Sequence, residues 1–241
     1  MKLIVANLKS SMVAEDLNDY LNYIEKKLVV PNNVVLIPSD IYVTEFLKSK
    51  QQIGVQNVSI YTEPNHTGSI TAWQLKNLGI KYCILGHAEV RDNYGESDKL
   101  IANKALNLLK QNIKPILCIG ESREQRAIKR TNTQLTKQLK PVFEISDNDM
   151  YEDIIIAYEP LWAIGSGIVP TIDEIEEVVN FIKRYIATNY KSDKVRVIYG
   201  GSVNRNNIKA IMEITNLDGV LVGTSSFKAE SLVSLVDEII E

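Results

Sequence analysis

Short apolar segments recur along the chain at fairly regular intervals, and each is continuous instead of alternating between apolar and polar residues. A continuous apolar run bounded by polar residues is typical of a β-strand that is buried on both faces. We predict strands over residues 3–6, 34–37, 53–55, 82–85, 115–118, 154–157, 195–199 and 219–222.

Segments with helical spacing lie between these runs. Thr171 and Glu174 have the spacing of a capping box at the start of one such helix. Apolar residues then follow on one helical face at Ile175, Val178, Val179, Ile182 and Ile186. The same pattern near the end of the chain predicts a helix that contains Leu232, Leu235, Val236 and Ile239.

Eight strands that alternate with helices in a chain of 241 residues predict an α/β fold, the closed parallel (βα)8 TIM barrel. We expect residues 1–241 to form one catalytic domain. An open doubly wound sheet is the alternative, but the first strand is not followed by the glycine pattern G-x-G-x-x-G. In a (βα)8 barrel the functional residues follow the carboxyl ends of the strands.

Composition excludes several classes of protein. The net charge is −3 and no basic stripe is visible, which argues against a nucleic-acid partner. The first apolar run is too short for a signal peptide or a membrane span. Cys83 and Cys118 lie inside strand-like runs without metal-binding spacing, and the chain has two histidines. We therefore expect a cytoplasmic protein with reduced cysteines and no metal, cofactor or membrane partner.

Polar residues that are able to do chemistry follow three of the predicted strands. Asn7 and Lys9 follow the first strand, His87 and Glu89 the fourth, and Glu159 the sixth. Each residue alone is more typical of a solvated loop or a structural contact. Because all strand ends of a barrel meet at one rim, we expect these side chains to form one site.

Glycines follow the seventh and eighth strands. Gly200-Gly201-Ser202 and Gly223-Thr224 leave backbone N–H groups accessible in the place where this fold usually binds phosphate, and Gly165 is a third possible donor. A carboxylate, a histidine and a lysine beside a phosphate suit proton transfer on a small phosphorylated carbonyl compound.

Six segments resemble the triosephosphate isomerase family, in the same order and across nearly the whole chain: ANLK, LGHAEVR, CIGE, AYEPLWAIGSG, YGGSV and DGVLVG. The resemblance implies an intramolecular aldose–ketose isomerase of glycolysis and gluconeogenesis. Its substrates would be dihydroxyacetone phosphate and D-glyceraldehyde 3-phosphate, interconverted through an enediolate.

The resemblance also implies roles for individual residues. Glu159 is the base that moves the proton, and neutral His87 polarises the carbonyl. Lys9 places positive charge at the substrate oxygen, Asn7 positions that oxygen, and Glu89 completes the polar set beside Lys9. Backbone amides would bind the phosphate at Gly165, Ser202, Gly223 and Thr224.

The stretch after Glu159 resembles the family's mobile lid, which closes over the substrate and expels water. It comprises Pro160, Leu161, Trp162, Ala163, Ile164, Gly165, Ser166 and Gly167. In the family, the hydroxyl oxygen of a tyrosine matching Tyr199 accepts a hydrogen bond, in the closed form, from a backbone N–H near the lid's C-terminal hinge. Here that position is Pro170, which has no N–H.

Three further positions depart from the family near the site. Leu8 replaces a tryptophan, which we interpret as a packing exchange. Ala88 replaces a serine that holds the base in the open form, so one hydrogen bond is missing. Thr224 replaces a glycine, and because a β-branched residue resists a positive φ, we expect it to begin a helical turn.

The resemblance implies a homodimer through the loop around Thr67, within 63–71. The family's acidic residue after the loop's tip is Ser69 here, and its arginine partner is Val90, so both members of that ion pair are absent. We interpret His66 as a surface loop residue.

Two other functions are alternatives to this one. A barrel aldolase or epimerase would need a lysine placed within a strand for a Schiff base, or a set of metal ligands, and neither is visible. A non-catalytic phosphate-binding relative would retain the glycines and lose Glu159 or His87, yet both residues are present.

Overall fold

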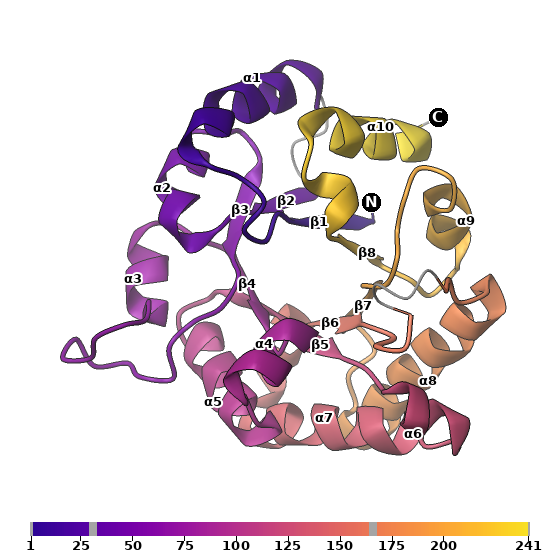
Figure 1. Ribbon diagram of the computed structural model, residues 1–241. Coiled ribbons are helices and arrows are strands. Elements are labelled where there is room, and N and C mark those ends of the chain that lie inside the picture. Colours follow the sequence, from indigo (N-terminus) through magenta and orange to yellow (C-terminus); the bar gives the residue numbers. More distant parts are fainter. Residues whose placement is uncertain (1, 29–32, 164–167, 241) are drawn as a thin grey trace.

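The fold is a closed barrel of eight parallel strands, in which β1 pairs with both β2 and β8 (Figure 1). The computed structural model describes residues 2–28, 33–163 and 168–240. The strands are β1 Leu3–Asn7, β2 Val34–Ile37, β3 Gln52–Val55, β4 Tyr82–Leu85, β5 Lys114–Ile119, β6 Ile155–Tyr158, β7 Arg196–Tyr199 and β8 Gly219–Val222. Closure confirms the predicted (βα)8 barrel and excludes the open sheet, and each predicted strand lies within one residue of an observed one at either end.

Helices connect consecutive strands and surround the barrel (Figure 1). The α-helices are α1 Leu17–Lys27, α2 Val43–Phe46, α3 Ala72–Asn77, α4 Ala88–Tyr94, α5 Asp98–Leu109, α6 Arg123–Ala127, α7 Thr131–Ile145, α8 Ile172–Tyr190, α9 Ile208–Glu213 and α10 Ala229–Ile240. Short 3₁₀ helices are η1 Ala14–Asp16, η2 Asp40–Tyr42, η3 Asn148–Asp153 and η4 Thr224–Ser226. The predicted capping box is confirmed, since Thr171 Oγ1 accepts from the Glu174 N–H and Glu174 accepts from the Thr171 N–H.

The strands bury apolar residues on both faces, as their continuous apolar runs predict. One cluster is made of alternate strand residues that fill the barrel interior: Leu3, Val5, Val35, Ile37, Tyr82, Ile84, Ile116, Cys118, Ile155, Ala157, Ile198 and Leu221. The larger cluster packs the outward-facing strand residues against the helices and includes Leu8, which is 1% exposed. Burial of Leu8 agrees with a packing exchange at that position. Cys83 and Cys118 are both buried and free.

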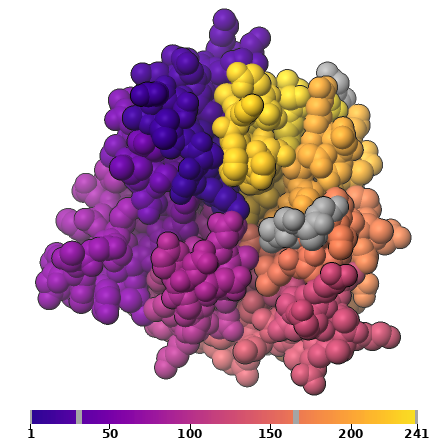
Figure 2. Space-filling model, viewed as in Figure 1, coloured from indigo at the N-terminus to yellow at the C-terminus, as the bar shows by residue number. Residues whose placement is uncertain are grey.

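Two features of the overall shape bear on function. The first and last parts of the chain lie against each other in the space-filling view, as the β1–β8 pairing requires (Figure 2). The loop between β3 and α3 protrudes away from the barrel in both views (Figures 1 and 2). Within the described residues, no helix is long and apolar enough to cross a membrane.

Candidate active site

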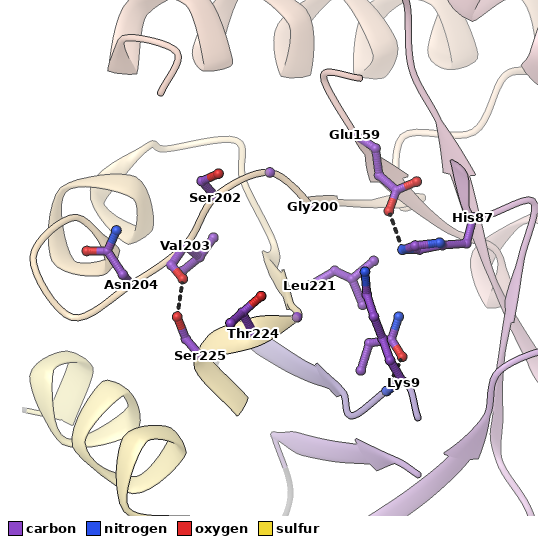
Figure 3. Close-up of a pocket in the computed structure, with 13 residues that line it drawn as sticks. Lys9, His87, Glu159, Gly200, Ser202, Val203, Asn204, Leu221, Thr224 and Ser225 are labelled. Atoms are coloured by element: carbon purple, nitrogen blue, oxygen red, sulfur yellow. Dashed lines mark hydrogen bonds and ion pairs between the residues drawn. The ribbon is translucent and has the colours of Figure 1, made fainter. Parts of the chain in front are cut away.

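A cavity of about 240 Å³ opens at the carboxyl ends of the strands. Residues that are far apart in the sequence line it: Asn7, Lys9, His87, Glu159, Gly200, Gly201, Ser202, Val203, Asn204, Leu221, Gly223, Thr224 and Ser225. Figure 3 shows Glu159, His87 and Lys9 at one end of this space, and Ser202, Thr224 and Ser225 at the other. The structure therefore brings Lys9, His87 and Glu159 into one cavity with the glycine-containing loops predicted from the sequence.

Glu159 directly follows β6 and is held by its backbone and by its carboxylate. Its N–H donates to the Ile119 carbonyl at 2.7 Å, which extends the β5–β6 pairing by one residue. Gly120 permits this approach, because a Cβ there would lie 1.8 Å from the Glu159 carbonyl oxygen. The Ala88 N–H donates to Glu159 Oε2 at 3.3 Å, and His87 Nε2 is 3.4 Å from Oε1. The serine hydroxyl of the family is absent, but the backbone at the same position still contacts the base.

The environment of Glu159 favours its neutral form. The residue is 2% exposed, and this burial raises the pKa of its carboxyl group above the usual range. His87, the Ala88 N–H, the Cys118 thiol and Lys9 act in the opposite direction, because each stabilises the carboxylate. A carboxylate that burial removes from water is a stronger base than one in water.

The imidazole of His87 is oriented by the start of α4. His87 is the N-cap of this helix, and its Nδ1 accepts from the Glu89 N–H at 3.3 Å. A nitrogen that accepts a hydrogen bond carries no proton, so the neutral ring has its proton on Nε2. Nε2 is the atom that faces Glu159 and the cavity (Figure 3). The site therefore presents a hydrogen-bond donor beside the carboxylate.

Lys9 is fixed in an unusual backbone conformation just after β1. Its φ is +49°, in the left-handed region that costs a residue with a side chain roughly 1–2 kcal/mol. The Lys9 N–H donates to Asn7 Oδ1 at 3.1 Å, and its carbonyl accepts from Gln56 Nε2 at 2.7 Å. Lys9 Nζ forms an ion pair with Glu89 at 2.5 Å. Glu89 does not line the cavity, and its hydrogen bond from Lys9 lowers the pKa of its carboxyl group.

The opposite end of the cavity is made by the residues after β7 and β8. Thr224 begins η4 and is not among the residues with positive φ, which confirms the expected helical start. Ser225 Oγ donates to the Val203 carbonyl at 2.7 Å and so joins the two loops (Figure 3). A Cβ on Gly201 would lie 2.1 Å from the Tyr199 hydroxyl, so glycine is required where this loop passes over the ring.

Part of the predicted lid lies outside the described residues, namely Ile164, Gly165, Ser166 and Gly167. Pro160, Leu161, Trp162 and Ala163 are described, and the Ala163 N–H donates to the Pro160 carbonyl at 2.8 Å. The Trp162 indole N–H donates to Glu121 Oε1 at 2.9 Å, and the Tyr158 hydroxyl donates to the same carboxylate at 3.1 Å. The residues that follow Glu159 are thus anchored to the loop after β5.

The loop after β3 is exposed from residue 61 to 69, and Gly68 has a φ of +93°. The His66 ring stacks on Tyr61 with 3.7 Å between the ring centroids. This position confirms His66 as a surface loop residue. Ser69 is exposed and Val90 is half-buried.

Some residues of the site escaped the sequence analysis. Gln56 directly follows β3, and a polar residue at a strand end could have been predicted to belong to the site. Its function here is to donate a hydrogen bond to the Lys9 carbonyl, and no sequence motif marks that contact. Glu121 lies in the CIGE segment and is fully buried beside Trp162. Its polar character after a buried strand was again the available signal.

Comparison with known proteins identifies the family. The family model described as triosephosphate isomerase matches residues 2–239. A protein named triosephosphate isomerase from Alkaliphilus oremlandii is 34% identical over 98% of this chain and 98% of its own length. One from Colwellia psychrerythraea is 38% identical over 82% of this chain and 81% of its own, and one from Buchnera aphidicola is 33% identical over 98% and 97%. The chain therefore belongs to the triosephosphate isomerase family.

Proposed function

We propose that Glu159, His87 and Lys9 perform the proton transfers by which this isomerase interconverts dihydroxyacetone phosphate and D-glyceraldehyde 3-phosphate. The family's reaction is a step of glycolysis, and the proposed proton transfers use no cofactor. One observation carries the assignment: the buried Glu159 carboxylate lies next to His87, with 3.4 Å between Glu159 Oε1 and His87 Nε2. Both residues line the cavity that also contains the glycine-rich loops after β7 and β8.

The reaction needs one base and one donor on the same side of the substrate. Glu159 takes a proton from the carbon next to the carbonyl, and the electron pair of the broken C–H bond forms the enediolate. The His87 Nε2–H donates to the carbonyl oxygen as negative charge develops there, and Lys9 stabilises this charge. The His87 imidazole gives its Nε2 proton to the former carbonyl oxygen and takes the proton of the neighbouring hydroxyl, whose oxygen becomes the new carbonyl oxygen. Glu159 then returns its proton to the former carbonyl carbon, which completes the aldose–ketose exchange. Asn7 lies beside Lys9 and supports its position through the Lys9 N–H.

The phosphate of the substrate would bind at the opposite end of the cavity. Backbone N–H groups of Ser202, Gly223 and Thr224 are the donors that we assign to it. The start of η4 at Thr224 supports this, because the first N–H groups of a helical turn have no partner within the turn. Gly165, the fourth predicted donor, lies outside the described residues.

A coupled assay of the purified chain tests this function. We expect rapid conversion of D-glyceraldehyde 3-phosphate to dihydroxyacetone phosphate without added metal or cofactor. Competitive inhibition by inorganic phosphate should accompany it. Retained phosphate binding without turnover would instead support the non-catalytic alternative. Turnover of other phosphosugars alone would support an epimerase or aldolase.

The residues after Glu159 would act as the hinge of a lid, by the family resemblance. Pro160 and the ring of Trp162 restrict the backbone of its first part. At the second hinge Pro170 has no N–H to offer to Tyr199. In the structure the Tyr199 hydroxyl is buried and has no hydrogen-bond partner among the described residues.

Replacing Tyr199 with phenylalanine should therefore have little effect on closure. We expect turnover and the affinity for an enediolate-phosphate analogue to change less than about threefold, whereas loss of an ordinary neutral hydrogen bond costs about 0.5–1.5 kcal/mol. Removing a buried hydroxyl without a partner should also leave Tm unchanged or higher. A tenfold loss of turnover or affinity at unchanged Tm would show that the hydroxyl finds a partner in the closed form.

The loop after β3 would contact a second copy of this chain. It protrudes from the barrel (Figure 1), and large apolar side chains are exposed in the segments that follow β2, β3 and β4: Ile41 is 75% exposed, Tyr61 51% and Tyr94 79%. Association through the loop around Thr67 would cover such surface.

The two free, buried cysteines are in keeping with a cytoplasmic location.

Restoring the family's ion pair at this interface tests the dimer. We expect Ser69→Glu combined with Val90→Arg to strengthen association beyond the sum of the single changes, with a coupling of about 0.5 kcal/mol or more. Each single change introduces a charge without its partner and should weaken the dimer. The dimer dissociation constants of the four proteins give the coupling directly. Zero coupling would mean that positions 69 and 90 do not meet.

A further inference from the structure

Arg126 on α6 contacts three parts of the chain: Glu121 after β5, Trp162 after β6, and Glu174 at the start of α8. Its guanidinium carbon is 4.3 Å from the centroid of the Trp162 ring, so the planar cation covers one face of the indole. Its Nη2 forms an ion pair with Glu174 Oε1 at 2.5 Å, and its Nη1 is 3.5 Å from Glu121 Oε1. The side chain of Arg126 is 29% exposed, so these contacts are partly shielded from water.

Trp162 and Glu174 belong to opposite ends of the segment that follows Glu159. Trp162 comes shortly after the base, and its indole N–H is bound to Glu121. Glu174 lies in the first turn of α8, where its second carboxylate oxygen caps the helix by accepting from the Thr171 N–H at 2.8 Å. Arg126 therefore contacts both ends of the segment through one rigid group.

The two ends differ in what else holds them. At the first end, Trp162 has both the stacking contact with Arg126 and the hydrogen bond to Glu121. At the second end, Pro170 offers no N–H, and the nearby Tyr199 hydroxyl has no partner among the described residues. The Arg126–Glu174 ion pair is thus a contact from outside α8 that fixes the start of this helix.

We propose that Arg126 is a positioning residue for the catalytic base, and that it acts by holding Trp162 and the start of α8 in fixed relation to Glu159. The proposal rests on the proposed role of Glu159. Only Pro160 and Leu161 separate Trp162 from the base, and the Pro160–Ala163 turn closes with a 2.8 Å hydrogen bond. A displacement of the indole is therefore transmitted to the Glu159 backbone through a short and restricted piece of chain.

The guanidinium suits this role better than an ammonium group would. Its plane stacks on the indole while its separate N–H groups reach Glu174 and Glu121 at the same time. A lysine at this position is able to keep one ion pair, but it cannot cover the ring and pair with both carboxylates. Among the described residues, the arginine's partners Trp162, Glu174 and Glu121 do not line the cavity, so its effect should appear in the chemical step and not in substrate binding.

The test compares Arg126→Met, Arg126→Lys and, as a matched control on the exposed side of the same helix, Arg123→Met. We expect Arg126→Met to lower kcat about tenfold. Displacement of a reacting group by about 1 Å costs on the order of 100-fold, and loss of the Arg126 contacts should allow Glu159 a smaller displacement than that. KM should change less than about threefold. Arg126→Lys should recover part of the loss, and Arg123→Met should retain full turnover.

Tryptophan fluorescence gives a second readout that does not depend on activity. The chain has two tryptophans, so in a Trp73→Phe background the emission reports on Trp162 alone. We expect Arg126→Met to shift this emission to longer wavelength and to increase quenching by acrylamide. Glu174→Gln retains a capping acceptor and removes the ion pair, and it should change kcat and emission in the same directions by smaller factors.

Some outcomes would overturn the proposal. Unchanged kcat in Arg126→Met overturns it, and so does a loss of kcat with unchanged Trp162 emission. An increase in KM that accounts for the whole loss would assign Arg126 to substrate binding. If Arg126→Met does not fold, Glu174→Gln decides, and unchanged kcat there overturns the proposal. A failure of the proposed function is distinct, because it would appear as full turnover in Glu159→Asp.

Discussion

Replacing Glu159 with aspartate should lower kcat about 100-fold while the protein stays folded. The substitution withdraws the carboxylate by one methylene, roughly 1 Å, and misplacement on that scale costs on the order of 100-fold. The backbone is unable to follow the shorter side chain, because the Glu159 N–H is bound to the Ile119 carbonyl and its own carbonyl packs on Gly120. The coupled assay measures the loss directly.

A matched control distinguishes the effect of position 159 from the general effect of replacing a glutamate with an aspartate. Glu177→Asp makes the same substitution on the exposed face of α8 and should keep near-full turnover. Thermal unfolding of both variants checks that Glu159→Asp remains folded. Near-full turnover of folded Glu159→Asp would mean that another group removes the proton.

The barrel was predictable because burial on both strand faces leaves a direct mark in the sequence. Strands such as Val34–Ile37 and Tyr82–Leu85 contain only buried residues, so their apolar runs are continuous and end where burial ends. Closure was less directly encoded. It follows from pairing between β1 and β8, the two strands that are most distant in the chain, and the regular alternation of strands and helices was its signal.

The candidate site was predictable to the extent that it depends on strand ends. Asn7 ends β1, and Lys9, His87 and Glu159 each follow a β-strand, so the barrel brings them to one rim. The family resemblance added what position alone does not give, namely a role for each side chain.

Contacts that depend on backbone conformation were not predictable. The Ala88 N–H that reaches Glu159 is present whatever the side chain, so replacement of the family's serine removes a hydroxyl and leaves this backbone contact in place. The positive φ of Lys9 and its support by Gln56 likewise leave no pattern in the sequence. Arg126 is a surface arginine by sequence, and its partners Trp162 and Glu174 come from distant segments that only the folded chain brings together.

Replacing His87 with glutamine should lower kcat by roughly 10²–10³, the usual effect of removing one donor to a developing oxyanion. Affinity for a phosphate analogue should change less than about threefold, because His87 lies at the end of the cavity away from Ser202 and Thr224 (Figure 3). The imidazole is a rigid donor whose Nε2–H is set by the Glu89 N–H at Nδ1, whereas a glutamine amide is able to rotate and to present its oxygen instead. His66→Gln is the control, since the chain's other histidine is exposed and should tolerate the change once dimer content is matched by light scattering. Equal losses of turnover and of analogue affinity in His87→Gln would assign this residue to binding, and the polarising role would have to pass to Lys9.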